Sequence, residues 1–318
     1  IPFILSALLV GVSIFIRLRM NESPLFAKLK SEGKTSRNPI KESFGNKENL
    51  RMVLIALFGA TAGQGVVWYT GQFYAMTFLE QTCKVEFVQT RNIIAIALMI
   101  GTPLFIYFGW LSDKMGRKLI MMLGMILAVI LYRPIYKHIY ASTDLTQKVE
   151  ITDKLQNIET EEISETGETF IVQTKTHFYT DSTRMVETVK SSAAVPATVV
   201  ETKQEILLAG DLYYGVIGMV LIQVVLVTMV YGPIAAFLVE IFPTRIRYTS
   251  MSLPYHVGNG IFGGLTPFIA TALYEVSKTE ARPQGDPFAG LWYPIGIAAL
   301  TFVVGMIFLS NKNKGEVQ

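Results

Sequence analysis

"GWLSDKMGRK" occupies residues 109–118, and this stretch decides how the rest of the chain is interpreted. This stretch is rich in glycine and charged residues, whereas the runs 92–108 and 119–131 on either side carry almost no charge. A compact charged turn between two apolar segments predicts a short loop that joins two membrane-spanning helices.

The composition favours a membrane protein. Of the 318 residues, 51% are hydrophobic and 17% are charged, and the mean hydropathy is +0.39. An ordinary soluble domain carries about 25% charged residues, and such a chain cannot bury this much apolar surface in one globular core. A transmembrane helix needs roughly 20 mostly apolar residues. The candidate segments are 2–16, 52–79, 92–110, 119–136, 207–238, 251–274 and 288–309.

Several functional classes lack their signatures in this sequence. A single cysteine, Cys83, excludes an internal disulfide and a zinc cluster. The sequence holds no GxxxxGK[ST], HExxH or GxSxG motif, so we expect no enzyme, no catalytic residue, no cofactor and no metal site. The net charge of +3 comes from basic residues dispersed along the chain, and no nucleic-acid partner is indicated.

The distribution of basic residues predicts the orientation. The loop 17–51 carries nine Lys/Arg against four Glu, which places it in the cytoplasm by the positive-inside rule. Alternation then puts 111–118, 239–250 and the tail with Lys312 and Lys314 on the same side. The stretch 137–206, with 12 acidic residues against seven Lys/Arg, is expected outside.

The outer stretch has strand-like sequence in its middle. "ETFIVQTKTHFYT" and "RMVETVK" are rich in β-branched residues and flank a turn at Asp181-Ser182. A hairpin or small β-rich appendage is predicted, with a disordered acidic loop as the alternative. His177 in this stretch shows no partners for a metal site, and no function is assigned to it.

The stretch 109–118 resembles the loop motif of the major facilitator superfamily, G-x-L-x-D-x-x-G-R-K. The matching residues are Gly109, Leu111, Asp113, Gly116, Arg117 and Lys118. The residues suit such a loop without the family. Gly109 lets two helices approach closely, Gly116 permits a tight turn, and Asp113 can accept hydrogen bonds from a helix N-terminus.

Two more stretches carry the same resemblance. "EIFPTRIR" places Glu240 seven positions before Arg247, with Arg245 between them, a spacing similar to that of sugar-porter-like members. "RLRMNESPLF" is similar to the mid-protein Glu-Ser-Pro boundary of that group. The string from Glu240 to Gly264 looks most like the metabolite:proton symporter family, which includes proline/betaine, α-ketoglutarate and shikimate permeases.

The resemblance implies an all-α integral membrane fold of twelve helices, of which this chain would supply the C-terminal six-helix half plus the end of helix six. It also implies an inverted repeat and a substrate site at the midplane, against an N-terminal half absent from this chain. The expected divisions are 1–16 (end of helix six), 17–51 (central cytoplasmic loop), 52–136 (helices seven to nine), 137–206 (extracytoplasmic insertion), 207–309 (helices ten to twelve) and 310–318 (cytoplasmic tail).

Polar side chains inside the apolar segments are the candidates for a substrate site. Burying an amide in lipid without a partner costs several kcal/mol, so these residues are expected to point inward. They are Gln64, Trp68, Tyr69, Gln72, Gln223, Tyr231, His256 and Asn259. The glycines in 59–65 and 260–264 allow close backbone approach, and Pro254 and Pro267 are expected to bend their helix.

The sequence therefore predicts a multi-pass protein of the inner or plasma membrane with a cytoplasmic C-terminus. The leading function is transport of a small polar metabolite by alternating access, coupled to protons on the evidence of the resemblance. A cytoplasmic gate is expected from Gly109, Asp113, Gly116, Arg117, Lys118, Glu240, Arg245 and Arg247. The alternatives are a sugar-porter-like facilitator, a membrane sensor that uses the outer insertion, and a passive channel.

Overall fold

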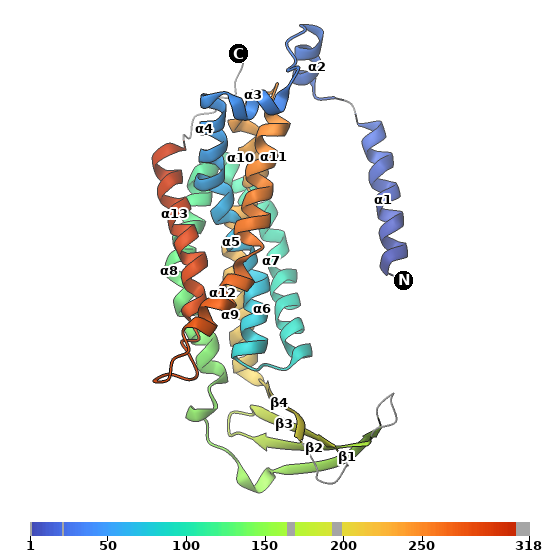
Figure 1. The fold of residues 1–318 in the computed structure, drawn as a ribbon, viewed down its shortest axis with the longest axis vertical. Coiled ribbons are helices and arrows are strands. Elements are labelled where there is room, and N and C mark those ends of the chain that lie inside the picture. Colours follow the sequence, from blue (N-terminus) through green and yellow to red (C-terminus); the bar gives the residue numbers. More distant parts are fainter. Residues whose placement is uncertain (1, 21, 164–168, 193–198, 310–318) are drawn as a thin grey trace.

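The computed structural model describes residues 2–20, 22–163, 169–192 and 199–309, and it is a helix bundle with a β-sheet at one end (Figure 1). Lys312 and Lys314 of the expected tail lie outside the described residues. The first helix, α1 (Pro2–Arg19), lies apart from the bundle (Figure 1), and its described side chains are exposed. Two short helices, α2 (Pro24–Ser31) and α3 (Pro39–Gly45), lead from it to the bundle.

Within the described residues, five helices are long and apolar enough to cross a membrane. They cover Lys47–Thr82, Phe87–Met115, Arg117–Thr143, Gly210–Ile241 and Ala289–Phe308. Each matches one of the apolar segments expected from the sequence. The first three extend beyond the expected segment at both ends, the fourth is shifted by three residues, and Ala289–Phe308 lies within the expected 288–309.

The first of these helices is not a uniform α-helix. It consists of α4 (Lys47–Ala56), η1 (Leu57–Thr61), α5 (Ala62–Tyr69), η2 (Thr70–Tyr74), α6 (Ala75–Thr77) and η3 (Phe78–Thr82). The three η segments are π-helical turns. Such turns are rare and often occur at functional sites.

The other long helices are more regular. They are α7 (Phe87–Met115), α8 (Arg117–Thr143), α9 (Gly210–Tyr231) with α10 (Ile234–Ile241), and η7 (Ala289–Leu291) with α13 (Trp292–Phe308).

The segment 251–274, expected as one helix, is interrupted in the structure. It forms α11 (Arg247–Val257), the π-helical η6 (Gly258–Gly263) and α12 (Thr266–Val276). The interruption falls at Gly264 and Leu265. The next helix, α12, begins directly after them and has Pro267 as its second residue. Glycine weakens a helix and proline lacks an N–H donor, so a break at this position follows from the sequence.

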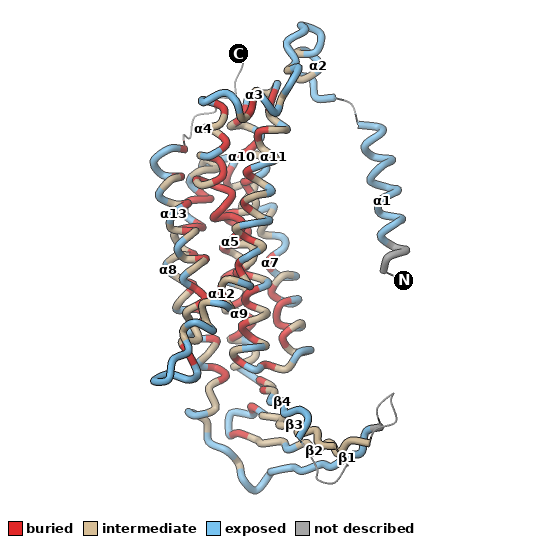
Figure 2. The backbone as a smooth tube through the Cα atoms, viewed as in Figure 1, coloured by how far each residue is buried: buried red, intermediate tan, exposed pale blue. Residues whose placement is uncertain are grey.

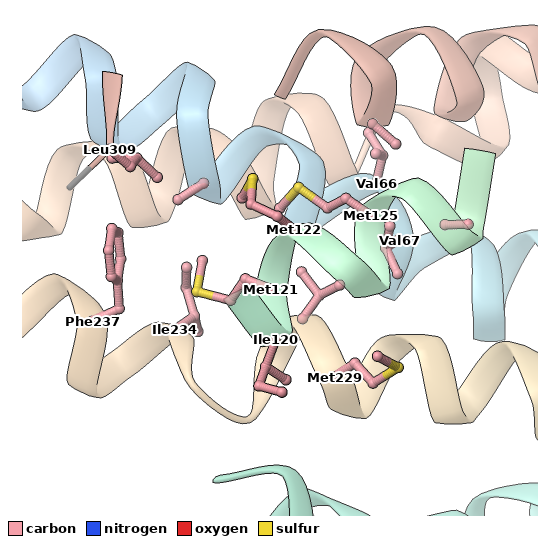
Figure 3. Packing of buried hydrophobic residues seen from close by; sticks show 14 of the residues in the cluster. Val66, Val67, Ile120, Met121, Met122, Met125, Met229, Ile234, Phe237 and Leu309 are labelled. Carbon is pink, nitrogen blue, oxygen red and sulfur yellow. The ribbon is translucent and has the colours of Figure 1, made fainter. Parts of the chain in front are cut away.

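The bundle is held by apolar packing along its axis, with buried residues concentrated on the inner faces of the helices (Figure 2). Met121, Met122 and Met125 of α8 pack in one cluster with Val66 and Val67 of α5 (Figure 3). Methionine is unbranched and flexible, so it fills irregular gaps between helices.

Beyond the helices, a four-stranded antiparallel sheet forms in the order β1 (Gln156–Ile163), β2 (Thr169–Phe178), β3 (Arg184–Ser192), β4 (Val199–Leu207). The turn expected at Asp181-Ser182 joins β2 to β3, and Ser182 has a φ of 66°. Because α8 continues to Thr143, the first residues of the expected insertion 137–206 are helical. Short η4 (Leu145–Gln147) and η5 (Thr152–Lys154) lead into the sheet.

The sheet is joined to the bundle near the end of β4, at Ile206 and at Leu208, which follows the strand. The N–H of Ile206 donates to the Lys84 carbonyl at 2.7 Å, and the N–H of Glu86 donates to the Ile206 carbonyl at 3.0 Å. The Gln89 side chain then binds both backbone groups of Leu208, at 2.8 Å each. These contacts connect β4 to the loop between η3 and α7.

Candidate functional site

The two ends of the bundle differ in their chemistry. We call the end that carries residues 109–118 the motif end and the opposite end, next to β1–β4, the sheet end (Figure 1). The polar residues singled out by the sequence fall into two groups, one at the motif end and one along the inside of the bundle.

At the motif end, Arg117 is the centre of a charged cluster. Its guanidinium donates to Oδ1 of Asp113, four residues earlier in α7, at 3.0 Å, and it forms an ion pair with Glu240 of α10. The side chain of Arg117 is 21% exposed and that of Glu240 35%, whereas that of Asp113 is 61% exposed. The cluster therefore joins the α7–α8 turn to the end of α10, mainly through Arg117 and Glu240.

The neighbouring Lys118 holds the end of a different helix. Its Nζ donates to the carbonyls of Leu309, at 2.5 Å, and Met306, at 2.9 Å, at the C-terminus of α13. The last carbonyls of a helix lack partners within it and carry partial negative charge, so a lysine stabilises this position.

Arg245 and Arg247 do not join the Arg117 cluster through ion pairs. Arg245 pairs with Glu42 of α3, and Nε of Arg247 donates to the Phe242 carbonyl at 3.1 Å. Arg247 therefore makes a local backbone contact and forms no ion pair with Glu240, although the sequence places both residues in one gate. Here the Glu-x6-Arg spacing places the two residues on either side of the break between α10 and α11.

The two glycines of the motif have different roles. Gly116 has a φ of 98°, a backbone conformation that only glycine adopts without strain, so it permits the turn between α7 and α8. A Cβ on Gly109 would meet nothing within 4 Å, so this residue is not the one that makes the close approach. That approach comes from Gly232, whose Cβ would lie 3.4 Å from the Gly109 nitrogen.

Inside the bundle, Gln64 of α5 and Asn259 of η6 form a reciprocal amide pair. Nε2 of Gln64 donates to Oδ1 of Asn259 at 2.9 Å, and Nδ2 of Asn259 donates to Oε1 of Gln64 at 3.1 Å. Nδ2 of Asn259 also donates to the Tyr255 carbonyl at 3.0 Å. Gln64 is 1% exposed, so its amide is buried and satisfied by this pair.

Glycines let these two segments touch. A Cβ on Gly65 would overlap the Gly258 carbonyl oxygen, and a Cβ on Gly263 would lie 2.6 Å from the Tyr69 ring. The close-contact glycines of η6 are thus Gly258 and Gly263. Within the stretch 260–264 singled out by the sequence, Gly263 makes the expected close approach, whereas a Cβ on Gly260 would meet nothing within 4 Å.

An aromatic group adjoins the amide pair. The Trp68 and Tyr231 rings lie 4.6 Å apart between centroids, and the hydroxyls of Tyr231 and Tyr255 are 2.7 Å apart. Phe105 packs edge-on against Tyr231 with centroids 5.9 Å apart. Tyr69 instead lies beside Phe73, at 5.1 Å between ring centroids.

The remaining candidates are more dispersed. Gln223 of α9 is fully buried, and neither atom of its amide has a hydrogen-bond partner among the described residues. Gln72 is partly buried in η2. His256 is exposed, and its ring packs against Tyr255 with centroids 5.8 Å apart.

Two residues of this region were not singled out by the sequence. Oγ1 of Thr61 donates to the Pro254 carbonyl at 2.7 Å, a second polar link between the same two helices. Tyr255 contacts both Tyr231 and Asn259. Its position four residues before Asn259, on one helix face, was the available signal.

A pocket of about 410 Å³ lies at the sheet end, between η3 and α12. Tyr74, Phe78, Glu80, Tyr274 and Glu275 are among its lining residues, and none of the candidate substrate residues lines it. The described residues hold no cluster of His, Cys, Asp or Glu able to bind a metal ion.

No family model matches the chain, and no solved structure matches it. Several curated proteins match the chain. Over 319 residues the chain is 24% identical to a protein of Staphylococcus aureus named as a proline/betaine transporter, covering 99% of this chain and 51% of that protein. Over 316 residues it is 23% identical to the alpha-ketoglutarate permease of Escherichia coli, covering 99% of this chain and 54% of the permease.

The chain spans about half the length of the curated relatives it matches. These relatives are named transporters or permeases, and the structure has five helices fit to span a membrane. The chain is therefore a multi-pass membrane protein similar to metabolite transporters, in agreement with its resemblance to the major facilitator superfamily.

Proposed function

We propose that this chain is the C-terminal half of a twelve-helix secondary transporter, which moves a small polar metabolite across the inner or plasma membrane by alternating access. A twelve-helix protein of this kind is consistent with a chain that covers 51% of its transporter relative. The tail and the Arg117 cluster would then face the cytoplasm, and β1–β4 would form the extracytoplasmic insertion.

The observation that carries the proposal is the Gln64–Asn259 pair. It joins two helices that touch through glycine and that both contain π-helical turns beside the paired residues. A polar bond between two deformable helices can be made in one conformation and exchanged for substrate or water in another. Differential contacts of this kind are what a two-state transporter requires.

The substrate would contact the same inner region. Trp68, Tyr231 and Tyr255 supply ring faces and hydroxyls, and Gln64 and Asn259 supply amide donors and acceptors. Gln223 fits this role because its buried amide is unsatisfied in the described conformation, and such a group gains most from a new partner. The relatives' names make proline, betaine and 2-oxoglutarate the first solutes to test.

Proton coupling is the second part of the proposal, and the family resemblance is its support. The acidic residues of the long helices lie near their ends, for example Glu80, Asp113, Asp211 and Glu240. We therefore expect the proton-carrying carboxylate in the N-terminal half. His256 is the candidate within this chain, because an imidazole can both accept and donate a proton.

The test is uptake by the full-length protein in proteoliposomes, with and without an imposed pH gradient. Wild-type protein should accumulate one of these solutes, and Asn259→Leu should lower the initial rate at least about tenfold, a loss of about 1.4 kcal/mol in transition-state stabilisation. Ile106→Ala is the matched control, since Ile106 is a 79% exposed apolar residue of α7. Equal uptake by Asn259→Leu and wild type would contradict the proposed site.

A further inference from the structure

Arg133 is a charged residue within the membrane-spanning helix α8, and it has no ion-pair partner among the described residues. Its Nε is buried without a hydrogen bond. The contact that the structure gives it is the Trp292 ring, whose centroid is 5.0 Å from the guanidinium carbon. A buried donor of a charged group without a hydrogen bond is costly, so this arginine would gain from an anionic partner outside the described residues.

Trp292 shows the depth at which Arg133 lies. It is the first residue of α13 at the sheet end, and its side chain is 56% exposed. Tryptophan is enriched where the hydrocarbon core meets the headgroups. Because the Arg133 guanidinium is stacked on this ring, it lies at the same headgroup level.

The surface around this contact is apolar and exposed, as expected of a surface in contact with lipid. Helices α8 and α13 pack side by side along their length (Figure 1). Their outer stripes are exposed and apolar: Leu119, Leu123 and Ile130 on α8, and Leu300, Val303 and Ile307 on α13. Arg133 follows Ile130 by one helical turn, so the charge is at the sheet-side end of a lipid-facing seam.

A second basic residue extends the same stripe. Lys137, one turn after Arg133, is exposed, and the structure gives its Nζ no partner among the described residues. The nearest acidic residue along the helix is Asp144, two turns further on. The carboxylate of Asp144 already accepts from the hydroxyl of Thr146 at 2.7 Å and from its N–H at 3.0 Å.

We propose that Arg133 and Lys137, together with Trp292, bind the phosphate of an anionic phospholipid in the leaflet at the sheet end. The planar guanidinium can donate two parallel hydrogen bonds to phosphate oxygens, and Lys137 adds a point charge. The acyl chains would lie along the seam between α8 and α13. Two basic residues favour phosphatidylglycerol over phosphatidylcholine, whose trimethylammonium group adds a third positive charge.

The experiment measures quenching of Trp292 fluorescence by lipid in the full-length protein. The protein is reconstituted in vesicles of phosphatidylcholine that contain either dibrominated phosphatidylglycerol or dibrominated phosphatidylcholine. The Trp292 signal is the difference between the protein and its Trp292→Phe variant. We expect phosphatidylglycerol to bind the site about 30-fold more tightly than phosphatidylcholine, since each of the two basic residues near an anionic lipid contributes about fivefold.

Arg133→Gln should lower this preference to about fivefold, and Arg133→Gln combined with Lys137→Gln should abolish it. Arg133→Lys should retain most of the preference and shows whether the site tolerates substitution. The matched control is Lys114→Gln, since Lys114 lies 4.0 Å from the centroid of the Trp110 ring in a similar cation–ring contact near the motif end. Equal quenching by the two lipids in the unaltered protein would overturn the proposal. Displacement of the bound lipid by inorganic phosphate alone would also overturn it, since the site would then bind a free anion.

Discussion

Gln64 and Asn259 exchange two side-chain hydrogen bonds, at 2.9 and 3.1 Å, across 195 positions of sequence. This pair satisfies an amide that is almost completely buried between two helices. Because a buried amide without a partner costs about 1–3 kcal/mol, the two residues depend on each other. Variants that replace one or both of these residues can therefore separate the effect of the pair on stability from its effect on transport.

Replacing one member of the pair should destabilise the protein more than replacing both. Asn259→Leu leaves the Gln64 amide buried without a partner, and we expect a loss of about 1–3 kcal/mol. Gln64→Leu combined with Asn259→Leu removes both polar groups and should recover most of that loss. The measurement is the melting temperature of the purified protein in detergent, as a double-mutant cycle.

Uptake provides the second readout for this pair. If the amides contact substrate, the double variant should be stable but inactive. Additive changes in melting temperature would show that the two amides are not coupled, and normal uptake by the double variant would remove them from the substrate site.

The second prediction concerns the close contact of α5 with η6. Gly65→Ala should destabilise the protein by about 1–3 kcal/mol or more, because its methyl group would overlap the Gly258 carbonyl oxygen. Gly218→Ala is the control, since a Cβ there meets nothing within 4 Å and alanine is the better helix former. Equal melting temperatures for the two variants would show that the helices separate easily at this contact.

The sequence predicts the long helices well, because about 20 consecutive apolar residues suffice to specify each of them. It also predicts the glycine turn at Gly116, whose motif leaves little choice of conformation. It does not identify the partner of Gln64. The Asn259 contact and the Gly65–Gly258 contact depend on how two distant segments pack, and single-residue patterns carry no information about that pairing.

The ion pairs of the charged residues could not be predicted from the sequence either. Spacing alone suggested that Glu240 and Arg247 act together, whereas the structure pairs Glu240 with Arg117 and turns Arg247 to a backbone carbonyl. The break between α10 and α11 changes the direction of the chain between them. A seven-residue spacing predicts proximity only where the helix is continuous.

The third prediction concerns the anchor of the β2–β3 turn. Nζ of Lys148 lies 2.5 Å from Oδ2 of Asp181, and it donates to Oγ1 of Thr183 at 2.9 Å. Partial burial alone would raise the pKa of Asp181, but the hydrogen bonds from Lys148 and Thr183 outweigh it and hold the pKa below its ordinary value of 3.8. The stabilisation is therefore present above that value and is lost as the pH falls through the lower, folded-state pKa.

Asp181→Asn reproduces the neutral carboxyl at pH 7 and should speed amide hydrogen exchange of residues 148–151 and 179–183 several-fold. Exchange in the helices should be unaffected. Asp153→Asn is the control, because Asp153 is exposed and the structure gives its carboxylate no partner among the described residues. Unchanged exchange in Asp181→Asn would mean that backbone pairing alone holds the turn.

The last prediction separates the two carboxylates that Arg117 contacts. Glu240→Gln leaves a largely buried guanidinium with only the exposed Asp113, so it should destabilise the protein by about 1 kcal/mol or more. Asp113→Asn removes an exposed pair across the α7–α8 turn and should change stability by less than about 0.5 kcal/mol. The melting temperature ranks the two variants, and uptake by well-inserted protein reports whether either contact belongs to a gate.

The charge-reversed combination Arg117→Glu with Glu240→Arg should recover stability if the pair acts mainly as an ion pair. A larger loss in Asp113→Asn than in Glu240→Gln would contradict the ranking. It would mean that Asp113 has a partner outside the described residues.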